Sequence, residues 1–362
     1  MAPLTRTGTA SYPPGAAYRR VSGTLSLVSA AGARVTPGPS EIAGPEEFAD
    51  IFSAAHAQIC QVVRGKPDEV RLALTCVFSE GHLLIEDVPG VGKTSLAKAM
   101  ARTLGLSWQR VQCTPDLLPS DLMGSSMFDR PSNDFVFRPG SVFANIVLVD
   151  EINRASPKSQ AALLEAMEER QVTVDATTYP LPEPFVVVAT QNPVEHEGTF
   201  PLPVSELDRF LMRLHLGYPD KASEIGILQD QPSGSQVDDL GALVPPEKVR
   251  AMARFSATTY VAPAVRSYLV DLAEATRHHP GVAIGLSPRA VLGAQRASRC
   301  LAASGGRDYV APDDVKAVLG PVSEHRLLLT PELAFSQKTA ADVVREVSAS
   351  VPVPVPRAAR AV

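Results

Sequence analysis

The stretch HLLIEDVPGVGKT, residues 82–94, decides the fold. It begins with an apolar run, passes through a turn rich in proline and glycine, and ends in Gly-Lys-Thr. This order is typical of a phosphate-binding loop, whose pattern is G-x-x-x-x-G-K-[ST] between a strand and a helix. Asp87 stands where the first glycine of that pattern would be, so one position of the pattern is not matched. We expect a strand over 82–86, a phosphate site after it, and a helix over 95–104.

The residues of this loop have the chemistry that a bound phosphate requires. Gly90 and Gly92 allow backbone N–H groups to turn toward the phosphate, and the helix N-terminus adds its dipole. Lys93 can reach the β- and γ-phosphates, and the Thr94 hydroxyl can bind Mg²⁺. A glycine turn without a ligand is the alternative, which the flanking strand and helix disfavour. The candidate nucleotide-binding residues of the loop are Pro89, Gly90, Val91, Gly92, Lys93, Thr94 and Ser95.

A second apolar run, 145–150, ends in the acidic pair Asp150 and Glu151. Phosphoryl transfer requires a carboxylate that holds Mg²⁺ and a group that orients the attacking water. We assign the first role to Asp150, which would share the metal with Thr94, and the second role to Glu151. An acidic pair at a strand end is common by chance, so its combination with the phosphate loop supports the assignment.

A third apolar run, 185–190, leads to Asn192. An asparagine at a strand end beside the γ-phosphate can orient the attacking water. The alternative is a turn former before Pro193, a role that asparagine often has.

Apolar runs and helical patterns alternate from residue 82 to about 219. Runs at 108–112 and 211–216 bring the strand-like segments to five, and three of the five are continuously apolar, as is typical of parallel strands covered on both faces. The alternation predicts a doubly wound α/β sheet. Only helical patterns follow Pro219. The expected division is a flexible N-terminal tail at 1–43, an αβα core at 44–219, an all-α domain at 220–335, and a C-terminal helix with a proline-rich tail at 336–362.

The composition excludes several classes of protein. The 34 Lys and Arg against 39 Asp and Glu give a formal net charge of −5, so no basic excess is present to neutralise a nucleic-acid backbone. The four cysteines are far apart, which argues against a disulfide framework or a Cys zinc site and fits a reducing compartment. No apolar run reaches the roughly 18 residues that span a bilayer. We expect a cytoplasmic protein with no membrane span.

Longer stretches around these motifs resemble the MoxR family of AAA+ ATPases. The resemblance covers about residues 45–330 and implies an AAA+ P-loop NTPase core with a five-stranded parallel sheet, followed by an all-α lid domain. The family commonly has aspartate at the position of Asp87. Besides the opening stretch, the resemblance rests on TPDLLPSDLMGS (114–125), VLVDEINRASPKSQAALLEAMEERQVTV (147–174), ATQNPVEHEGTFPLP (189–203) and LDRFLM (207–212).

The resemblance also implies roles for single residues. Asn192 resembles the sensor 1 residue, Arg209 the arginine finger offered to a neighbouring subunit, and Arg289 the sensor 2 residue on the lid. Val63 and Gly65 lie in a segment that resembles the adenine contact. From the residues alone, Arg209 could instead pair with an acidic neighbour, Asp208 or Glu206, on a solvated face.

A hairpin is implied at 116–139, where the family has an insertion in its second helix. Phe128, Phe135 and Phe137 make this segment unusually apolar for a protruding loop. The hairpin therefore either contacts a partner or folds back onto the core.

The resemblance implies Mg²⁺-dependent hydrolysis of ATP that remodels a protein partner or activates it in a chaperone-like way. The implied partner carries a von Willebrand factor A domain. An arginine finger acts only across an interface, so we expect a homo-oligomer, a hexameric ring. Two alternatives stay open. One is a nucleic-acid-remodelling motor, which the net charge disfavours, and the other is a low-turnover nucleotide-gated scaffold, which Glu151 and Asn192 disfavour.

Overall fold

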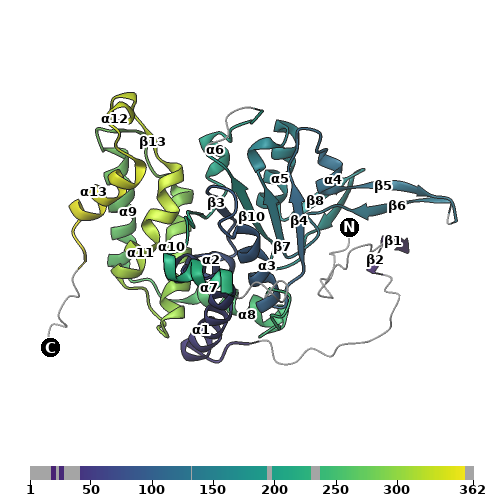
Figure 1. The fold of residues 1–362 in the computed structure, drawn as a ribbon, viewed down its shortest axis with the longest axis horizontal. Coiled ribbons are helices and arrows are strands. Elements are labelled where there is room, and N and C mark those ends of the chain that lie inside the picture. The colour runs from purple at the N-terminus through teal and green to yellow at the C-terminus, as the bar shows by residue number, and fades with distance from the viewer. Residues whose placement is uncertain are drawn as a thin grey trace.

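An α/β core and a helical region pack side by side in the structure, a computed structural model (Figure 1). It describes residues 18–21, 24–27, 41–131, 133–193, 198–229 and 237–354. Most of the predicted N-terminal tail, the last eight residues of the predicted C-terminal tail, and residues 194–197 of the motif after Asn192 lie outside the described residues.

The core contains the predicted five-stranded sheet, in the order β11-β3-β10-β7-β4. All neighbouring strands in it pair in parallel. The order differs from the order along the chain, so helices must cross over both faces, as the alternating pattern predicts. The strands are β3 (Leu83–Glu86), β4 (Trp108–Gln112), β7 (Ile146–Asp150), β10 (Val186–Gln191) and β11 (Met212–Leu214).

Each central strand buries alternate side chains on opposite faces of the sheet. In β7, Ile146 and Leu148 join the cluster that contains the helical region, whereas Val147 and Val149 join the cluster under the helix that follows β7. All four side chains are fully buried. Burial on both faces explains why this strand is continuously apolar in sequence.

Most helices begin with a proline at their first position, where its missing N–H has no partner to lose. Ser156 caps the helix after β7, because its hydroxyl accepts from the Ser159 N–H at 3.3 Å. The core helices are α1 (Pro45–Val62), α2 (Pro67–Phe78), α3 (Lys93–Thr103), α4 (Pro119–Met123), α5 (Pro157–Glu169) and α6 (Val204–Leu207), with the 3-10 helix η1 (Ile152–Arg154).

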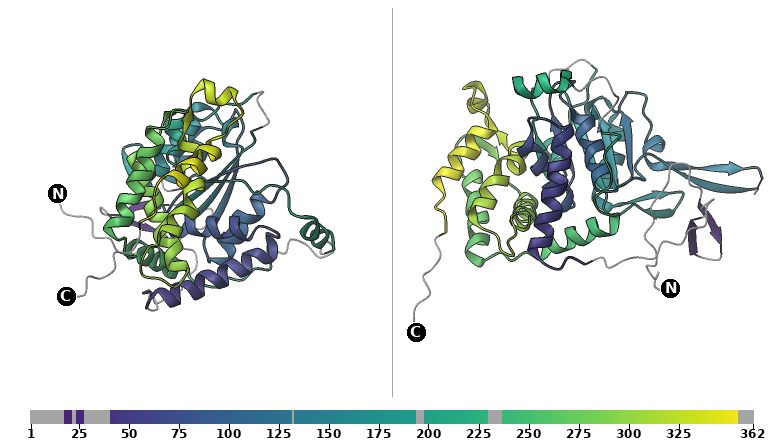
Figure 2. Two further views of the ribbon diagram at one scale, coloured as in Figure 1. Left: turned by 90° about the vertical axis from the view of Figure 1, so that its left-hand side faces the viewer. Right: turned by 60° about the horizontal axis from the view of Figure 1, so that its bottom comes forward.

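A long hairpin of β5 (Gly124–Asp129) and β6 (Asp134–Pro139) projects from the side of the core that faces away from the helical region (Figures 1 and 2). A shorter hairpin joins β8 (Gln171–Val174) and β9 (Thr177–Pro180). Strand β1 (Tyr18–Val21) pairs with β6 and with β2 (Thr24–Leu27). The structure thus places two strands in the segment predicted as a flexible tail.

The helical region follows the core, as predicted, and contains one small ribbon that the sequence did not predict. In this ribbon β12 (Val282–Ile284) pairs with β13 (Leu328–Leu329), and both strands are too short to leave a pattern. The helices are α7 (Lys221–Gln229), α8 (Pro246–Thr258), α9 (Pro263–Arg277), α10 (Pro288–Ser304), α11 (Pro312–Ser323), α12 (Pro331–Phe335) and α13 (Ala340–Ser350), with the 3-10 helix η2 (Glu324–Arg326).

Helix α13 packs against α9 and α11 and buries Val343, Val344 and Val347. We therefore propose that the helical domain continues to about residue 351 instead of ending at 335.

Aromatic side chains join the core to the helical region. Phe48 of α1 stacks on Phe255 of α8, with ring centroids 5.9 Å apart, and meets Phe78 of α2 edge-on at 5.7 Å. One hydrophobic cluster consequently runs through both parts. None of the described helices is both long and apolar enough to cross a membrane.

Candidate active site

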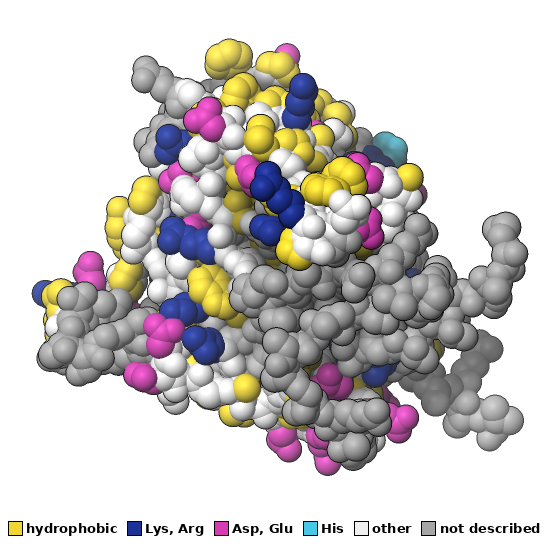
Figure 3. Space-filling view, turned by 90° about the vertical axis from the view of Figure 1, so that its right-hand side faces the viewer, with side chains coloured by type: hydrophobic (Ala, Val, Ile, Leu, Met, Phe, Trp, Pro, Cys, Tyr) yellow, Lys and Arg dark blue, Asp and Glu magenta, His cyan; other side chains and the backbone are white. Residues whose placement is uncertain are grey.

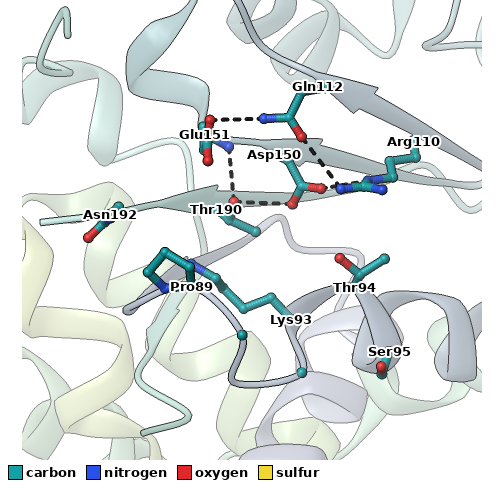
Figure 4. Close-up of a pocket in the computed structure, with 12 residues that line it drawn as sticks. Pro89, Lys93, Thr94, Ser95, Arg110, Gln112, Asp150, Glu151, Thr190 and Asn192 are labelled. Carbon is teal, nitrogen blue, oxygen red and sulfur yellow. Dashed lines mark hydrogen bonds and ion pairs between the residues drawn. The ribbon is translucent and has the colours of Figure 1, made fainter. Parts of the chain in front are cut away.

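A cavity of about 350 Å³ lies at the carboxyl ends of β3, β4, β7 and β10 (Figure 4). Ligands of open parallel sheets bind at this edge. Most of the predicted phosphate-site residues meet here, whereas Val91 packs toward the hydrophobic core. The cavity is lined by Pro89, Gly90, Gly92, Lys93, Thr94, Ser95, Arg110, Gln112, Asp150, Glu151, Thr190 and Asn192.

The phosphate loop leaves space where an anion would bind. Gly90 and Gly92 have φ values of 85° and 94°, which strain any residue with a side chain. No described atom lies within 4 Å of a Cβ built at either glycine, so the backbone on this side is open. Gly92 is the N-cap of α3, which begins at Lys93, two residues earlier than predicted. The arrangement fits a phosphate group at a helix N-terminus.

Asp87, the departure from the loop pattern, has a structural role. One carboxylate oxygen accepts from the Val88 N–H at 2.8 Å, and the other accepts from the Gly217 N–H beyond β11. Lys93 Nζ donates to the Asp87 carbonyl oxygen at 2.8 Å. The aspartate thus ties the start of the loop to the neighbouring edge of the sheet, which a glycine could not do.

Asp150 and Glu151 both face the cavity, and each has charged or polar partners. Asp150 Oδ2 lies 2.7 Å from Arg110 Nε, and Asp150 Oδ1 accepts from the Thr190 hydroxyl at 3.3 Å. Glu151 Oε2 accepts from Gln112 Nε2 at 2.9 Å and from Arg154 Nη1 at 3.1 Å.

Glu151 has a left-handed backbone, with φ 56° and ψ 52°. This conformation costs a residue with a side chain about 1–3 kcal/mol and is frequent at functional sites. The Glu151 N–H donates to the Thr190 hydroxyl at 3.0 Å, which supports the turn. The turn ends β7 and directs the Glu151 side chain to the cavity beside Asp150 (Figure 4).

The donor set of the cavity fits Mg²⁺. Thr94 offers a hydroxyl and Asp150 a carboxylate. Among the residues that the structure describes, no group of three or more His, Cys, Asp or Glu could hold a metal ion. Mg²⁺ does not require such a group, because it takes one or two protein oxygens and completes its shell with phosphate and water.

Arg110, Gln112 and Thr190 also line the cavity and were not predicted from the sequence. All three occupy strands next to β7, and the register pairs Gln112 with Asp150. The order of strands in the sheet brings them to the site, and no local motif carries that order. Cys113 follows β4 and stays a thiol, because burial, with Asp150 and Glu151 nearby, raises its pKa to about 12.

The structure brings Asn192 into the cavity, where it is 7% exposed. It does not bring Val63 or Gly65 there. Val63 is buried in the core, and a Cβ on Gly65 would lie 2.6 Å from the Ser223 hydroxyl of α7. Their contact with adenine stays a prediction.

Arg209 and Arg289 lie at the other end of β3, away from the phosphate loop. They line a second cavity of about 160 Å³ between the core and the helical region, and both pair with Glu168. Arg209 Nε lies 3.1 Å from Glu168 Oε2, close enough for an ion pair but without hydrogen-bond alignment. The acidic partner of Arg209 is therefore Glu168 of α5 and not its sequence neighbours Asp208 or Glu206, and Asp208 pairs with Arg326. We call the arginines of this cavity the arginine cluster: Arg170, Arg209, Arg289, Arg296 and Arg326.

Comparison with known proteins identifies both parts of the chain. Residues 82–212 match the family described as "ATPase family associated with various cellular activities (AAA)", and residues 274–347 match the AAA lid domain. "Uncharacterized protein YeaC" of Bacillus subtilis (strain 168) is 43% identical over 87% of this chain and 98% of its own length. "Chaperone MoxR1" of Mycobacterium tuberculosis is 37% identical over 90% of this chain and 91% of its own.

A solved structure has the same overall fold. It is that of a predicted ATPase from Cytophaga hutchinsonii, which is 33% identical to this chain with a TM-score of 0.79. The match covers 86% of this chain and 97% of that one. The likeness therefore extends over the core and the helical region.

Proposed function

The chain belongs to the MoxR family of AAA ATPases, and on that premise we propose that it hydrolyses ATP with Mg²⁺ in the phosphate-loop cavity. One observation carries the proposal. The open glycines of the loop face two carboxylates and Asn192 across a single cavity at the carboxyl edge of the sheet.

Seven residues of the cavity have parts in this reaction. Lys93 and the backbone of Gly90 and Gly92 bind the phosphates and neutralise their charge. Thr94 and Asp150 would hold Mg²⁺, which supplies charge stabilisation at the phosphates when bound. Glu151 orients and polarises the attacking water, and Asn192 helps to position it.

Two substitutions separate binding from turnover. Lys93→Ala should weaken ATP binding strongly, because the phosphates lose their cation. Glu151→Gln should bind ATP but hydrolyse it about 10²–10⁴-fold more slowly, because general base catalysis contributes about that factor. Nucleotide affinity and steady-state phosphate release on both variants test this. Wild-type hydrolysis by Glu151→Gln would remove Glu151 from its role. Slow wild-type turnover despite tight ATP binding would favour the nucleotide-gated scaffold.

We place Arg209 and Arg289 in the site of a neighbouring subunit. Neither arginine lines the phosphate-loop cavity of its own chain, and both line the second cavity, where their side chains are partly exposed. An arginine supplied across an interface stabilises the charge of the transition state. Each site would then need two copies of the chain, and the family resemblance favours a hexameric ring, with the cytoplasm as its compartment.

The work done with this energy is, in our proposal, the remodelling or chaperone-like activation of a protein partner with a von Willebrand factor A domain. The relative named as a chaperone, 37% identical over most of both chains, supports this class of function. The β5–β6 hairpin is our candidate for the contact. Phe128 and Phe135 pair edge-on at 5.5 Å and are 52% and 68% exposed.

The third aromatic of the hairpin behaves differently. Phe137 is buried and stacks on Tyr179 with ring centroids 3.9 Å apart. The sequence-based alternatives thus divide along the hairpin, because its base folds onto the core while the pair farther out is exposed. Figure 3 views the molecule from the side of the hairpin, and on the described part of this face hydrophobic side chains lie among side chains of both charges.

A matched pair of substitutions tests the hairpin. Phe135→Ser should leave basal hydrolysis within a few-fold and abolish the rate change caused by a von Willebrand factor A domain protein of the same organism. Phe137→Ala should instead cost about 3–5 kcal/mol of stability, as buried Phe truncations do. Intact partner stimulation in Phe135→Ser would refute the contact, and stimulation of the wild type by duplex DNA would favour the nucleic-acid motor.

A further inference from the structure

The 3-10 helix η2 of the lid packs against residues 208–213, the segment that carries Arg209. Its middle and last residues are buried, and all three of its residues contact positions 208–213. Glu324 Oε2 lies 3.5 Å from Arg213 Nη2. His325 Nε2–H donates to the Phe210 carbonyl oxygen at 3.0 Å.

Arg326 makes most of the contacts and is only 5% exposed. Its Nε donates to Asp208 Oδ1 at 2.6 Å, and Nη2 donates to the carbonyl oxygens of Asp208 at 3.0 Å and Phe210 at 2.7 Å. Nη1 donates to the carbonyl oxygen of Leu211 at 3.1 Å and also to that of Val322 in α11. The acceptors lie on both sides of Arg209 in sequence, so one guanidinium fixes the backbone before and after it.

Asp208 extends this contact to the second arginine. Its Oδ2 accepts from the Ser287 hydroxyl at 3.3 Å. Ser287 is the N-cap of α10, the helix that bears Arg289, and its hydroxyl accepts from the Ala290 N–H at 3.1 Å. The carboxylate of Asp208 therefore joins the loop of Arg209 to the start of the helix of Arg289.

We propose that Arg326 is a positioning residue for ATP hydrolysis: from the lid, it holds Arg209 and Arg289 as one unit aimed at the neighbouring subunit's phosphates. This inference rests on the proposed function of the two arginines. Movement of η2 with the lid then moves Arg209 and Arg289 together. An arginine is needed here, because its rigid planar guanidinium carries five N–H donors that serve several acceptors at once. A lysine ammonium is a compact group with three donors and cannot serve all of them.

Burial of the charge in this place argues for more than stability. An apolar residue of similar volume often stabilises a fold as well as a buried ion pair does. Arg326 instead directs its donors to the backbone around Arg209, and misplacement of a catalytic group by about 1 Å can cost about 10²-fold in rate.

A double-mutant cycle tests the coupling. The kcat and KM for ATP are measured for wild type, Arg326→Lys, Arg209→Ala and the double variant, each shown to assemble. Arg326→Lys should lower kcat about 10- to 100-fold with KM changed less than about 2-fold. In the Arg209→Ala background the same substitution should lower kcat by a clearly smaller factor, since only Arg289 is then left for Arg326 to position. Equal fold-changes in both backgrounds would overturn the proposal.

Hydrogen exchange tests the same contact without any need for activity. Arg326→Lys should speed exchange of the amides of residues 208–212. Arg307→Lys is the matched control, because Arg307 also binds a carboxylate, that of Asp314 at the other end of α11. Its Nη1 and Nη2 donate to the two Asp314 oxygens at 2.7 and 2.6 Å. The control should leave those amides and kcat unchanged. Asp208→Asn keeps the shape of the acceptor and is the second variant, for use if Arg326→Lys folds poorly. It should also speed exchange of the amides of residues 208–212.

The two measurements separate failure of this inference from failure of the proposed function. Suppose that Arg209→Ala hydrolyses ATP like the wild type while Arg326→Lys shows faster exchange. This result would refute the role of Arg209 in hydrolysis, but Arg326 would still hold the loop that carries Arg209. If amide exchange at residues 208–212 is unchanged in both Arg326→Lys and Asp208→Asn, Arg326 does not hold this loop, and the inference is overturned whatever the kinetics show.

Discussion

The phosphate-loop cavity and the arginine cluster occupy opposite ends of β3 and are built in different ways. The cavity draws on the carboxyl ends of adjacent strands, whose last residues face it as soon as the sheet forms. The arginine cluster needs α5, the loop before β11, α10 and η2, which come together only when the lid packs on the core. All the lining residues of the first cavity lie in the core, whereas the second cavity depends on the position of the lid.

This difference gives each region a separate task. In the proposed function, the cavity of one chain binds the phosphates, and the arginine cluster of the same chain serves the site of a neighbouring subunit. Glu168 meanwhile pairs with both Arg209 and Arg289, so an anion is already in contact with the two arginines.

The largest effect should come from mixing variants of the two regions. Arg209→Ala should keep ATP binding and lose most hydrolysis, since an arginine finger contributes about 10³–10⁵ in kcat in well-studied systems. Mixed with Lys93→Ala subunits, it should recover part of the activity, because each variant lacks a different half of a shared site. Phosphate release of mixed and unmixed samples is the measurement. Co-assembled mixtures without recovery would show that the two regions do not share a site across an interface.

A smaller effect is expected when the same chemical change is made in the cluster and in the cavity. Glu168→Gln should alter kcat less than about 5-fold, because an exposed ion pair is worth about 0–1 kcal/mol. Glu151→Gln makes the same carboxylate-to-amide change at the cavity and should cost about 10²–10⁴-fold. Steady-state kinetics on both variants compare the regions directly. A loss in Glu168→Gln as large as that in Glu151→Gln would mean that Glu168 takes part in the chemistry.

The sequence indicated which residues meet in the cavity, because they follow strands that are recognisable one by one; their roles in hydrolysis remain predictions. Lys93, Asp150, Glu151 and Asn192 each end or follow an apolar run, and the five-stranded parallel fold was confirmed. Gln112 escaped notice because β4 is next to β7 only in space.

The cluster was visible only in part from sequence. Arg209 and Arg289 were found through the family resemblance, and their roles remain predictions. Glu168 and Arg326 were not found, because they lie more than 30 residues from Arg209 and no periodic pattern distinguishes them. Long-range packing selects these partners, and a reading of local patterns does not contain that information.

The smallest expected effect concerns acid, to which the two regions should respond differently. His82 lines the arginine-cluster cavity; burial, reinforced by the nearby Arg170 and Arg296, lowers its pKa from 6.5 to about 3. It is held neutral, since Nδ1 accepts from the Val187 N–H and Nε2 donates to the Met167 carbonyl oxygen, both at 3.0 Å. Between pH 6.5 and 3 the unfolded chain therefore binds a proton that the folded chain does not, so stability falls as the pH falls.

The loss from His82 alone should reach about 2 kcal/mol at pH 5, at 1.36 kcal/mol per pH unit. His325, whose pKa burial also lowers, adds a loss of the same sign. Denaturant unfolding between pH 7.5 and 5 measures the free energy of unfolding at each pH. This free energy should fall less steeply for His82→Gln than for the wild type, because the variant takes up about one proton fewer on unfolding, even if it is less stable at pH 7.5. Cys113 near the phosphate loop stays protonated over this range and adds no slope. An identical decline in both proteins would mean that protonation of His82 does not weaken the arginine-cluster end of the sheet.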